Sequence, residues 1–343
     1  MLVRCGVGCG GGREDHAARF RCPGAAGLHP GAPLPSPRAG NGSLRPPPHP
    51  TPHRTSASFF IALLVGFGVL LAAGPARGAD YGGPLIDAHS HVPNATAINT
   101  YVAAMKRHNV VKVVLLGVGG LQKDDTIWLT AASKKYPDRV VAGLPLPDPT
   151  AGTAASQLEL QLERGRPRVI GEVHLRQVGR RTIDRDPNSA AFGKILDVAG
   201  KFGVPIVIHY ELTDAAETAL DRALAAHRKA TIVLAHGGEG PPGRLDRLLQ
   251  RNPNLVVDLS GMHFQRTPML ASETGSLDPG WKGLIEKMPD RFLIGVDVWA
   301  ARLFEPAMLD RLILWTRRIL GELRPDVAER VAHRNAAKLY RLE

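Results

Sequence analysis

The sequence predicts an α/β protein, a (β/α)8 TIM barrel that occupies residues 79–343. Three observations carry this prediction. Apolar runs rich in β-branched residues alternate eight times with segments of helical spacing. Runs such as "VPIVIHY" and "FLIGVDV" are largely apolar along their length, as expected of strands that are covered on both faces. Polar side chains gather where these runs end, and the C-terminal ends of the strands carry the chemistry in a barrel of this type.

The predicted strands and helices follow one another in a regular order. Strands are expected at residues 85–91, 110–118, 140–145, 169–175, 205–210, 231–236, 255–259 and 292–298. Helices are expected between them, among them residues 96–107, 125–135, 190–202, 215–226, 243–251 and 309–320. The last segment, "RPDVAERVAHRNAAKLYRLE", predicts a C-terminal closing helix. The alternative fold is an open doubly wound sheet, but no glycine-rich phosphate turn follows the first predicted strand.

The N-terminal part of the chain differs from the rest. Residues 1–57 are rich in Pro, Gly and Arg, as in "RPPPHPTPHR", so we expect low-complexity disorder or a mis-assigned start upstream of the true one. Residues 58–78 contain the uncharged run "FFIALLVGFGVLLAA", which is typical of a secretory signal peptide. Small residues at Ala76 and Gly78 predict cleavage near Ala79. We therefore expect an exported protein, periplasmic or secreted, with an uncleaved membrane anchor as the alternative.

Composition limits the chemistry and the partners of the mature chain. Cys5, Cys9 and Cys22 all precede the predicted cleavage position, so any metal must be held by nitrogen and oxygen donors. The first 78 residues contain 8 Lys+Arg and 2 Asp+Glu, which leaves 35 against 30, a net charge of +5, for the remainder. This charge is dispersed and no basic stripe carries interleaved aromatic residues, so nucleic acid is not an expected partner. No stable membrane association is expected after signal cleavage.

The motif "DAHSHV" places two histidines at the end of the first predicted strand. Side chains alternate along a strand, so His89 and His91 point the same way and Ser90 points to the other face. Two imidazoles on one face of a strand can bind the same metal ion. A His-x-His pair alone is only weakly informative, so the other strand ends decide its meaning.

Four further strand ends carry polar side chains of the same kind. A single strand-end histidine is more often structural and a strand-end aspartate often caps a helix, but so many donors at one end of a barrel predict a metal site. The fourth run, "VIGEVHL", contains Glu172 and His174 on one face. The fifth, sixth and eighth runs end with His209, His236 and Asp297.

This order of residues resembles the amidohydrolase superfamily of metal-dependent hydrolases. The stretches "DAHSHV", "LAHGG", "NLVVDLSG" and "NAAKLYRL" are similar to its amidohydrolase-related branch, which also contains aromatic-acid decarboxylases and lactonases. The resemblance covers about residues 84–342. It implies one or two divalent metals per chain, with Zn²⁺ as the first expectation and Mn²⁺ or Fe²⁺ as alternatives.

The resemblance also implies a role for each residue. His89, His91 and Asp297 would hold the first metal, and Asp297 would take a proton from the activated water. His209 would be a metal ligand, while His236 would complete a second site or assist the water. Glu172 stands where many relatives have a modified lysine and resembles the bridging glutamate of TatD-like deoxyribonucleases, which favours two metals.

Four residues are weaker candidates for substrate contacts. His174 and Arg176 share the alternating face of Glu172, so His174 is a candidate for supporting a metal ligand or contacting substrate, and Arg176 for clamping a substrate anion. The alternative is that both side chains face polar loops. His263, with Arg266 and Trp281, lies on or beside the long connection 260–280, where specificity is expected in this fold. Trp299 follows Asp297 by two residues and is expected to line the same end of the barrel as Asp297.

The sequence thus predicts a metal-dependent hydrolase that acts on a small-molecule ester, lactone, amide or phosphoester through metal-activated water. One alternative is a metal-dependent decarboxylase or hydratase that acts on a small, aromatic carboxylic acid. The other alternative is an exported metal-binding protein without catalytic activity. A homo-oligomer is only a family-level expectation.

Overall fold

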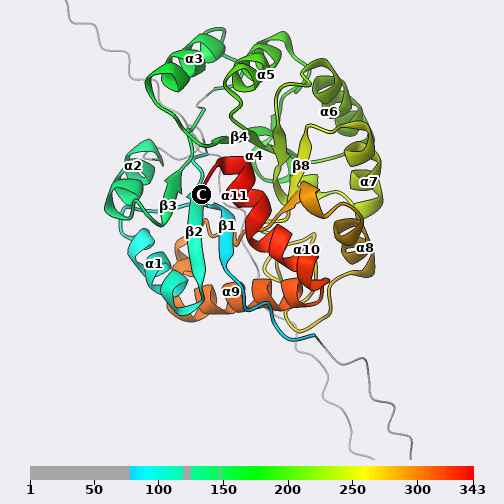
Figure 1. The fold of residues 1–343 in the computed structure, drawn as a ribbon. Helices are drawn as coiled ribbons and strands as arrows, with labels where there is room; N and C mark the ends of the chain where they lie inside the picture. The colour runs from blue at the N-terminus through cyan, green and yellow to red at the C-terminus, as the bar shows by residue number, and fades with distance from the viewer. Residues whose placement is uncertain (1–77, 119–124, 147) are drawn as a thin grey trace, which may run out of the picture. The chain divides into compact units, whose positions relative to one another are not determined.

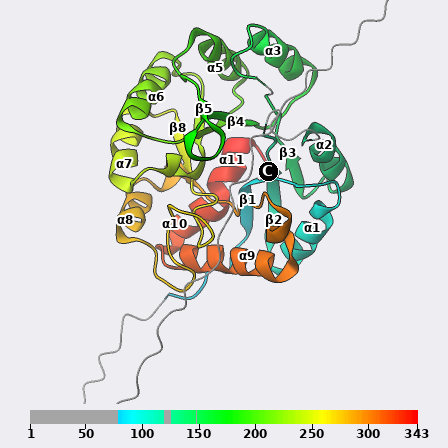
Figure 2. The same cartoon turned by 180° about the vertical axis from the view of Figure 1, so that it is seen from behind.

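The computed structural model describes residues 78–118, 125–146 and 148–343. The predicted low-complexity segment 1–57 and nearly all of the predicted signal peptide lie outside the described residues. Within the described part, no helix has the length and apolar character needed to cross a membrane. The described part is an α/β structure, in which helices surround a central set of strands (Figure 1, and from behind in Figure 2).

The strands form two sheets that meet at both edges. The first sheet has the order β1-β2-β3 and the second β5-β4-β6-β7-β8-β9, and all neighbours are parallel except β5 and β4. A parallel bridge between Leu144 and Ile170 joins the sheets on one side. On the other side Ala88 N donates to Ile294 O at 3.1 Å. Hydrogen bonds therefore follow eight parallel strands around a closed circuit. The eight parallel strands and the short antiparallel β5 are β1 (Leu85–Ser90), β2 (Val110–Leu115), β3 (Val140–Ala142), β4 (Ile170–Gln177), β5 (Ile183–Asp184), β6 (Ile206–Tyr210), β7 (Ile232–Leu234), β8 (Leu255–Asp258) and β9 (Phe292–Leu293).

Helices connect the strands and cover their outer face (Figure 1). The N-terminal caps follow from the sequence: Ser189, Thr213 and Asp278 accept hydrogen bonds from the first turns of α5, α6 and α8. The helices are α1 (Ala97–Arg107), α2 (Asp125–Lys135), α3 (Ala154–Arg164), α4 (Val178–Arg181), α5 (Ala190–Phe202), α6 (Asp214–Ala226), α7 (Pro242–Arg251), α8 (Pro279–Lys287), α9 (Pro306–Gly321), α10 (Pro325–Glu329) and α11 (Asn335–Tyr340).

The strands are buried on both faces, as their continuous apolar runs predict. Leu85 and Val113 pack outward in the cluster that the strands share with the helices. Their neighbours Ile86 and Val114 point inward, into a second cluster that also contains Tyr340 of α11. Figure 1 shows α11 lying across the strands at one end. This end is thus closed by apolar packing, which leaves the opposite ends of the strands for polar side chains.

Several strands are shorter than the sequence predicts, and the two that precede His236 and Asp297 show why. The run 231–236 forms ladder pairs only as β7, because His236, Gly237 and Gly238 adopt left-handed backbone conformations with φ of 55°, 56° and 58°. The run 292–298 pairs only as β9, and residues beyond it hydrogen-bond singly to β1, with Asp297 N donating to His89 O at 2.9 Å. The predicted closing helix runs without interruption from Pro325 to Tyr340, with a π-helical turn at Arg330–Arg334 between α10 and α11.

Candidate metal centre

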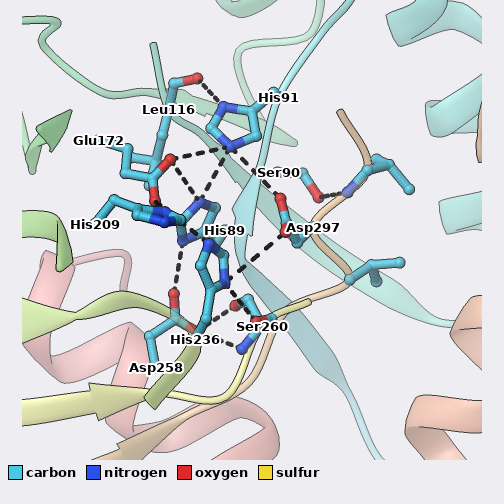
Figure 3. Close-up of polar contacts among 12 residues, drawn as sticks. His89, Ser90, His91, Leu116, Glu172, His209, His236, Asp258, Ser260 and Asp297 are labelled. Atoms are coloured by element: carbon cyan, nitrogen blue, oxygen red, sulfur yellow. Dashed lines mark hydrogen bonds and ion pairs between the residues drawn. The ribbon is translucent and has the colours of Figure 1, made fainter. Parts of the chain in front are cut away.

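Six side chains from five strands meet at one point of the described structure (Figure 3). They are the residues that the sequence analysis selected as metal ligands, and each is at most 5 % exposed. Each polar group lies within an apolar strand or shortly after one, so packing of the strands fixes its position. The residues are His89 in β1, His91 directly after it, Glu172 in β4, His209 in β6, His236 after β7 and Asp297 after β9.

Glu172 lies at the centre of this group, and its two oxygens face different imidazoles. Oε1 lies 3.1 Å from His209 Nδ1 and 3.4 Å from His236 Nε2. Oε2 lies 3.7 Å from His89 Nε2 and 3.6 Å from His91 Nε2. One carboxylate therefore stands between two sets of nitrogen donors.

Asp297 borders the group on the other side. Its Oδ1 lies 3.5 Å from His91 Nε2, and its Oδ2 lies 3.8 Å from His236 Nδ1. The Oδ2 atom also accepts a hydrogen bond from Arg266 Nη1 at 2.5 Å. The Asp297 backbone has a φ of 51°, a conformation that is uncommon for a non-glycine residue and that turns the chain at this point.

Hydrogen bonds at the outer ring nitrogens orient three of the imidazoles. His91 Nδ1 donates to Leu116 O at 2.8 Å, and His236 Nδ1 donates to Ser260 O at 2.7 Å. His89 Nδ1 lies 2.7 Å from Asp258 Oδ2. Because carbonyl and carboxylate oxygens accept these protons, the Nε2 lone pairs point inward, as metal ligands require.

The donor atoms fit a divalent metal. The inward nitrogens of His89 and His91 are 3.2 Å apart, and the nitrogen-to-carboxylate distances around Glu172 and Asp297 are mostly between 3.1 and 3.7 Å. Four ligands at ~2.0–2.1 Å in a tetrahedron are separated by about 3.3 Å, so a metal ion can be accommodated with little movement. Imidazoles and carboxylates without thiolates suit Zn²⁺, Mn²⁺ or Fe²⁺.

The electrostatics favour a cation at this point. Burial alone would raise the pKa of Glu172, but the positive potential of His174 and His89 outweighs it and holds the pKa well below its usual range. Burial likewise would raise the pKa of Asp297, but His236 and Arg266 hold it low. Burial opposes protonation of His89, yet Glu172 and Asp258 raise its pKa well above the ordinary value. Both carboxylates are thus ionised at neutral pH, and the negative potential attracts a proton or a metal ion.

The metal group forms the inner end of a cavity of about 560 Å³. Of the four weaker substrate candidates, the structure brings His174 and Trp299 into the lining. The lining comprises His91, Val118, Glu172, His174, Gln177, Arg181, His209, His236, Arg266, Asp297 and Trp299.

Arg176 and His263 do not line this cavity. The pairing of β4 with β6 shifts by one residue between His174 and Arg176, and Arg176 Nε instead lies 3.5 Å from Asp184 Oδ1 of β5. His263 is buried behind the site, with its ring against Phe264 and Trp315. Arg176 is therefore not placed to bind a substrate anion in this cavity, because its charge is paired with Asp184 on the β4–β5 hairpin.

Three side chains at the site were not named from the sequence, and a fourth, Arg266, was named only for its place on the long connection. Asp258 ends β8 in "NLVVDLSG", so the rule applied to the other strands could have found it. Arg266 lies on the long connection, but nothing in the sequence pairs it with Asp297. No pattern in the sequence indicates that Gln177 and Arg181 line the cavity, because their positions depend on the turn that α4 and β5 form after β4.

The amidohydrolase family model matches residues 86–342. The chain therefore belongs to the amidohydrolase family.

Solved structures with the same fold are distant in sequence. An uncharacterised TIM-barrel protein from Bordetella bronchiseptica is 18% identical, with a TM-score of 0.55, and the match covers 76% of this chain and 99% of that one. The 5-carboxyvanillate decarboxylase LigW from Sphingomonas paucimobilis is 15% identical, with a TM-score of 0.53 and the same coverage. An amidohydrolase from Burkholderia multivorans with bound zinc is 16% identical, with a TM-score of 0.52, and the match covers 76% and 100% of the two chains. Comparison with curated proteins finds no match. At these identities the likeness establishes the barrel fold.

Proposed function

We propose that the protein is a metal-dependent hydrolase in which Glu172, together with the surrounding histidines, would hold two divalent metals, with Zn²⁺ as the first expectation. One observation carries this proposal: Glu172 Oε1 faces His209 and His236, while Oε2 faces His89 and His91. Imidazole nitrogens beside both oxygens provide donors for a metal on each side of the carboxylate. The substrate is a small molecule with an ester, lactone, amide or phosphoester bond.

Three residues of the centre have different roles in the proposed hydrolysis. Metals held there would supply Lewis acidity, which polarises the substrate and lowers the pKa of water from ~15.7 towards ~7. Asp297 is ionised and faces the cavity, so it accepts the proton of the attacking water and passes it to the leaving group. Arg266 holds Asp297 Oδ2, which leaves Oδ1 directed towards His91 and the centre. Burial, the largest cause, and Arg266 lower the pKa of His236, so this imidazole is neutral and can act as a ligand.

Substitution of Asp297 by asparagine tests the proposal. Asparagine keeps the shape of the side chain but cannot accept the proton, so metal-dependent turnover should fall by about 10²–10⁴-fold. The measurement is a screen of chromogenic esters, lactones, anilides and phosphoesters on zinc-loaded protein, with Asp290→Asn, an exposed acid, as control. Turnover that survives in Asp297→Asn would refute the role of Asp297. Absence of any turnover in the wild type would favour a catalytically inactive metal-binding protein.

A second candidate is a metal-dependent decarboxylase that acts on a small aromatic acid. It is favoured by the structural likeness to 5-carboxyvanillate decarboxylase. Glu172 at the centre of the ligand group favours the hydrolase instead. Carbon dioxide release from an aromatic acid by protein that holds one metal per chain would reverse this order.

We also propose that the protein is exported, on the signal-like run that precedes residue 79. N-terminal sequencing of material from the producing cell tests this. A mature N-terminus near Ala79 is expected, and a mature N-terminus at Met1 would contradict it.

A further inference from the structure

The cavity above the metal group has a distinct outer end, and the inference drawn from it rests on the proposed hydrolytic function. Its inner end consists of the metal ligands and His174, while its outer end is lined by Gln177, Arg181 and Trp299. The proposed mechanism uses none of these three. They therefore are available to recognise the part of a substrate that does not react.

The β4–β5 hairpin determines which arginine reaches this end. β4 extends to Gln177, and β5 pairs with it in antiparallel orientation, so that Arg176 stands opposite Asp184 and forms an ion pair with it. The short helix α4, which connects β4 to β5, places Arg181 in the lining of the cavity. The charge available to a ligand is thus that of Arg181.

Arg181 and Gln177 both have unused hydrogen-bonding capacity. Within the residues that the structure describes, the Arg181 guanidinium forms neither an ion pair nor a hydrogen bond, although the Arg181 carbonyl accepts one from Thr182 Oγ1. The Arg181 side chain is exposed on the short helix α4. Gln177 is only 7 % exposed, yet its Oε1 has no hydrogen-bond partner among these residues. A buried amide oxygen without a donor is costly, which indicates that a ligand or water supplies the donor.

The remaining wall is aromatic. Trp299 is 40 % exposed although it is a large apolar side chain, and Arg302 lies 5.9 Å from its ring centre. An exposed tryptophan at the mouth of a polar cavity provides a flat surface for an apolar or aromatic group.

We propose that the substrates are amides that carry a carboxylate. The carboxylate pairs with Arg181, the amide N–H donates to Gln177 Oε1, and an apolar group of the substrate lies against Trp299. Hydrolysis of such a compound adds one water, breaks the C–N bond and releases a carboxylic acid and an amine.

N-benzoylglycine and its neutral analogue N-benzoylglycinamide test this inference, because they differ only in the terminal charge. Binding of each to zinc-loaded protein is measured by calorimetry, and hydrolysis is measured separately as benzoate release. The wild type should bind N-benzoylglycine at least about 10-fold more tightly than the amide. Arg181→Gln should remove this preference, whereas the matched control Arg176→Gln, outside the cavity, should keep it.

Equal affinity of the wild type for the two probes, no binding of N-benzoylglycine, or a preference that survives in Arg181→Gln would overturn the inference. Preferential binding that depends on Arg181, without any benzoate release, would support recognition by Arg181 and count against the hydrolytic function. The two claims therefore fail separately.

Discussion

At the scale of single residues, the metal centre depends on partners that hold each ligand. His89 illustrates this, because its Nε2 faces Glu172 while its Nδ1 lies 2.7 Å from Asp258 Oδ2. Asp258 is itself fixed by the backbone N–H of Ser260 at 2.9 Å and by the Ser260 hydroxyl. A metal ligand with a carboxylate behind it is held in one tautomer and one orientation.

The substitution Asp258→Asn should weaken metal binding without unfolding the protein. The amide keeps the volume of the side chain but removes the charge behind His89, so zinc affinity should fall by about 10–100-fold. Competition with a chromogenic chelator measures this. Asp290→Asn, which changes an exposed acid paired with Arg330, should leave the affinity unchanged. Equal zinc affinity of Asp258→Asn and the wild type would show that Asp258 does not position the ligand.

The residues predicted as ligands could be found from the sequence because each lies within an apolar run or shortly after one, and parallel strands in a barrel lie side by side. Arg181 could not be found in this way. Its place depends on a one-residue shift between β4 and β6 and on a four-residue helix, and neither produces a periodic pattern. The same shift explains why Arg176, the predicted anion clamp, lies outside the cavity.

At the scale of secondary-structure elements, α9 ties the start of the barrel to its end. Arg317 of α9 is only 7 % exposed and donates to backbone carbonyls on two segments. Its Nη1 reaches Tyr81 O at 2.6 Å and Gly83 O at 2.9 Å, before β1. Its other nitrogens reach the carbonyls of His108 and Asn109, between α1 and β2.

Loss of this side chain should destabilise the fold. Arg317→Ala leaves several carbonyls without their charged donor, so the free energy of unfolding should fall by about 3 kcal/mol. Urea denaturation measures the effect. Arg311→Ala on the same helix removes an exposed pair with Glu273 and should cost no more than about 1 kcal/mol. Similar losses in the two variants would show that the carbonyl contacts of Arg317 contribute little.

Element types were predictable from alternating apolar runs, but element ends were not. The apolar run up to His236 continues past the last ladder pair of β7, and the left-handed turn that follows depends on Gly237 and Gly238. A tertiary contact explains why glycine is needed in this turn: Gly237 lies so close to Trp281 that a side chain at position 237 would be crowded. Sequence periodicity contains no information about such contacts.

At the scale of the whole described unit, the two ends of the strands have opposite characters. One end carries the buried charges of the metal centre, and the other is filled by apolar residues around α11. Tyr340 of α11 is 1 % exposed within that apolar end, and its hydroxyl has no hydrogen-bond partner among the described residues. The tyrosine ring, and not its hydroxyl, is therefore expected to stabilise the closure.

Two substitutions at this position test the closure. Tyr340→Phe should leave the free energy of unfolding unchanged or raise it by about 1 kcal/mol, because it removes an unsatisfied buried hydroxyl. Tyr340→Ala should lower it by about 3–5 kcal/mol, because it opens a cavity. Urea denaturation of both variants gives the comparison. A loss of more than 1 kcal/mol in Tyr340→Phe would show that the hydroxyl has a stabilising partner.

The central claim is that Glu172 bridges two metals, and metal content per chain tests it most directly. Inductively coupled plasma mass spectrometry should be applied to wild type, Glu172→Ala, His89→Ala and the exposed control Glu159→Ala. The account predicts two metals in the wild type and in the control, and about one in Glu172→Ala. One metal in the wild type that is retained in Glu172→Ala and lost in His89→Ala would contradict the bridge and favour the decarboxylase instead.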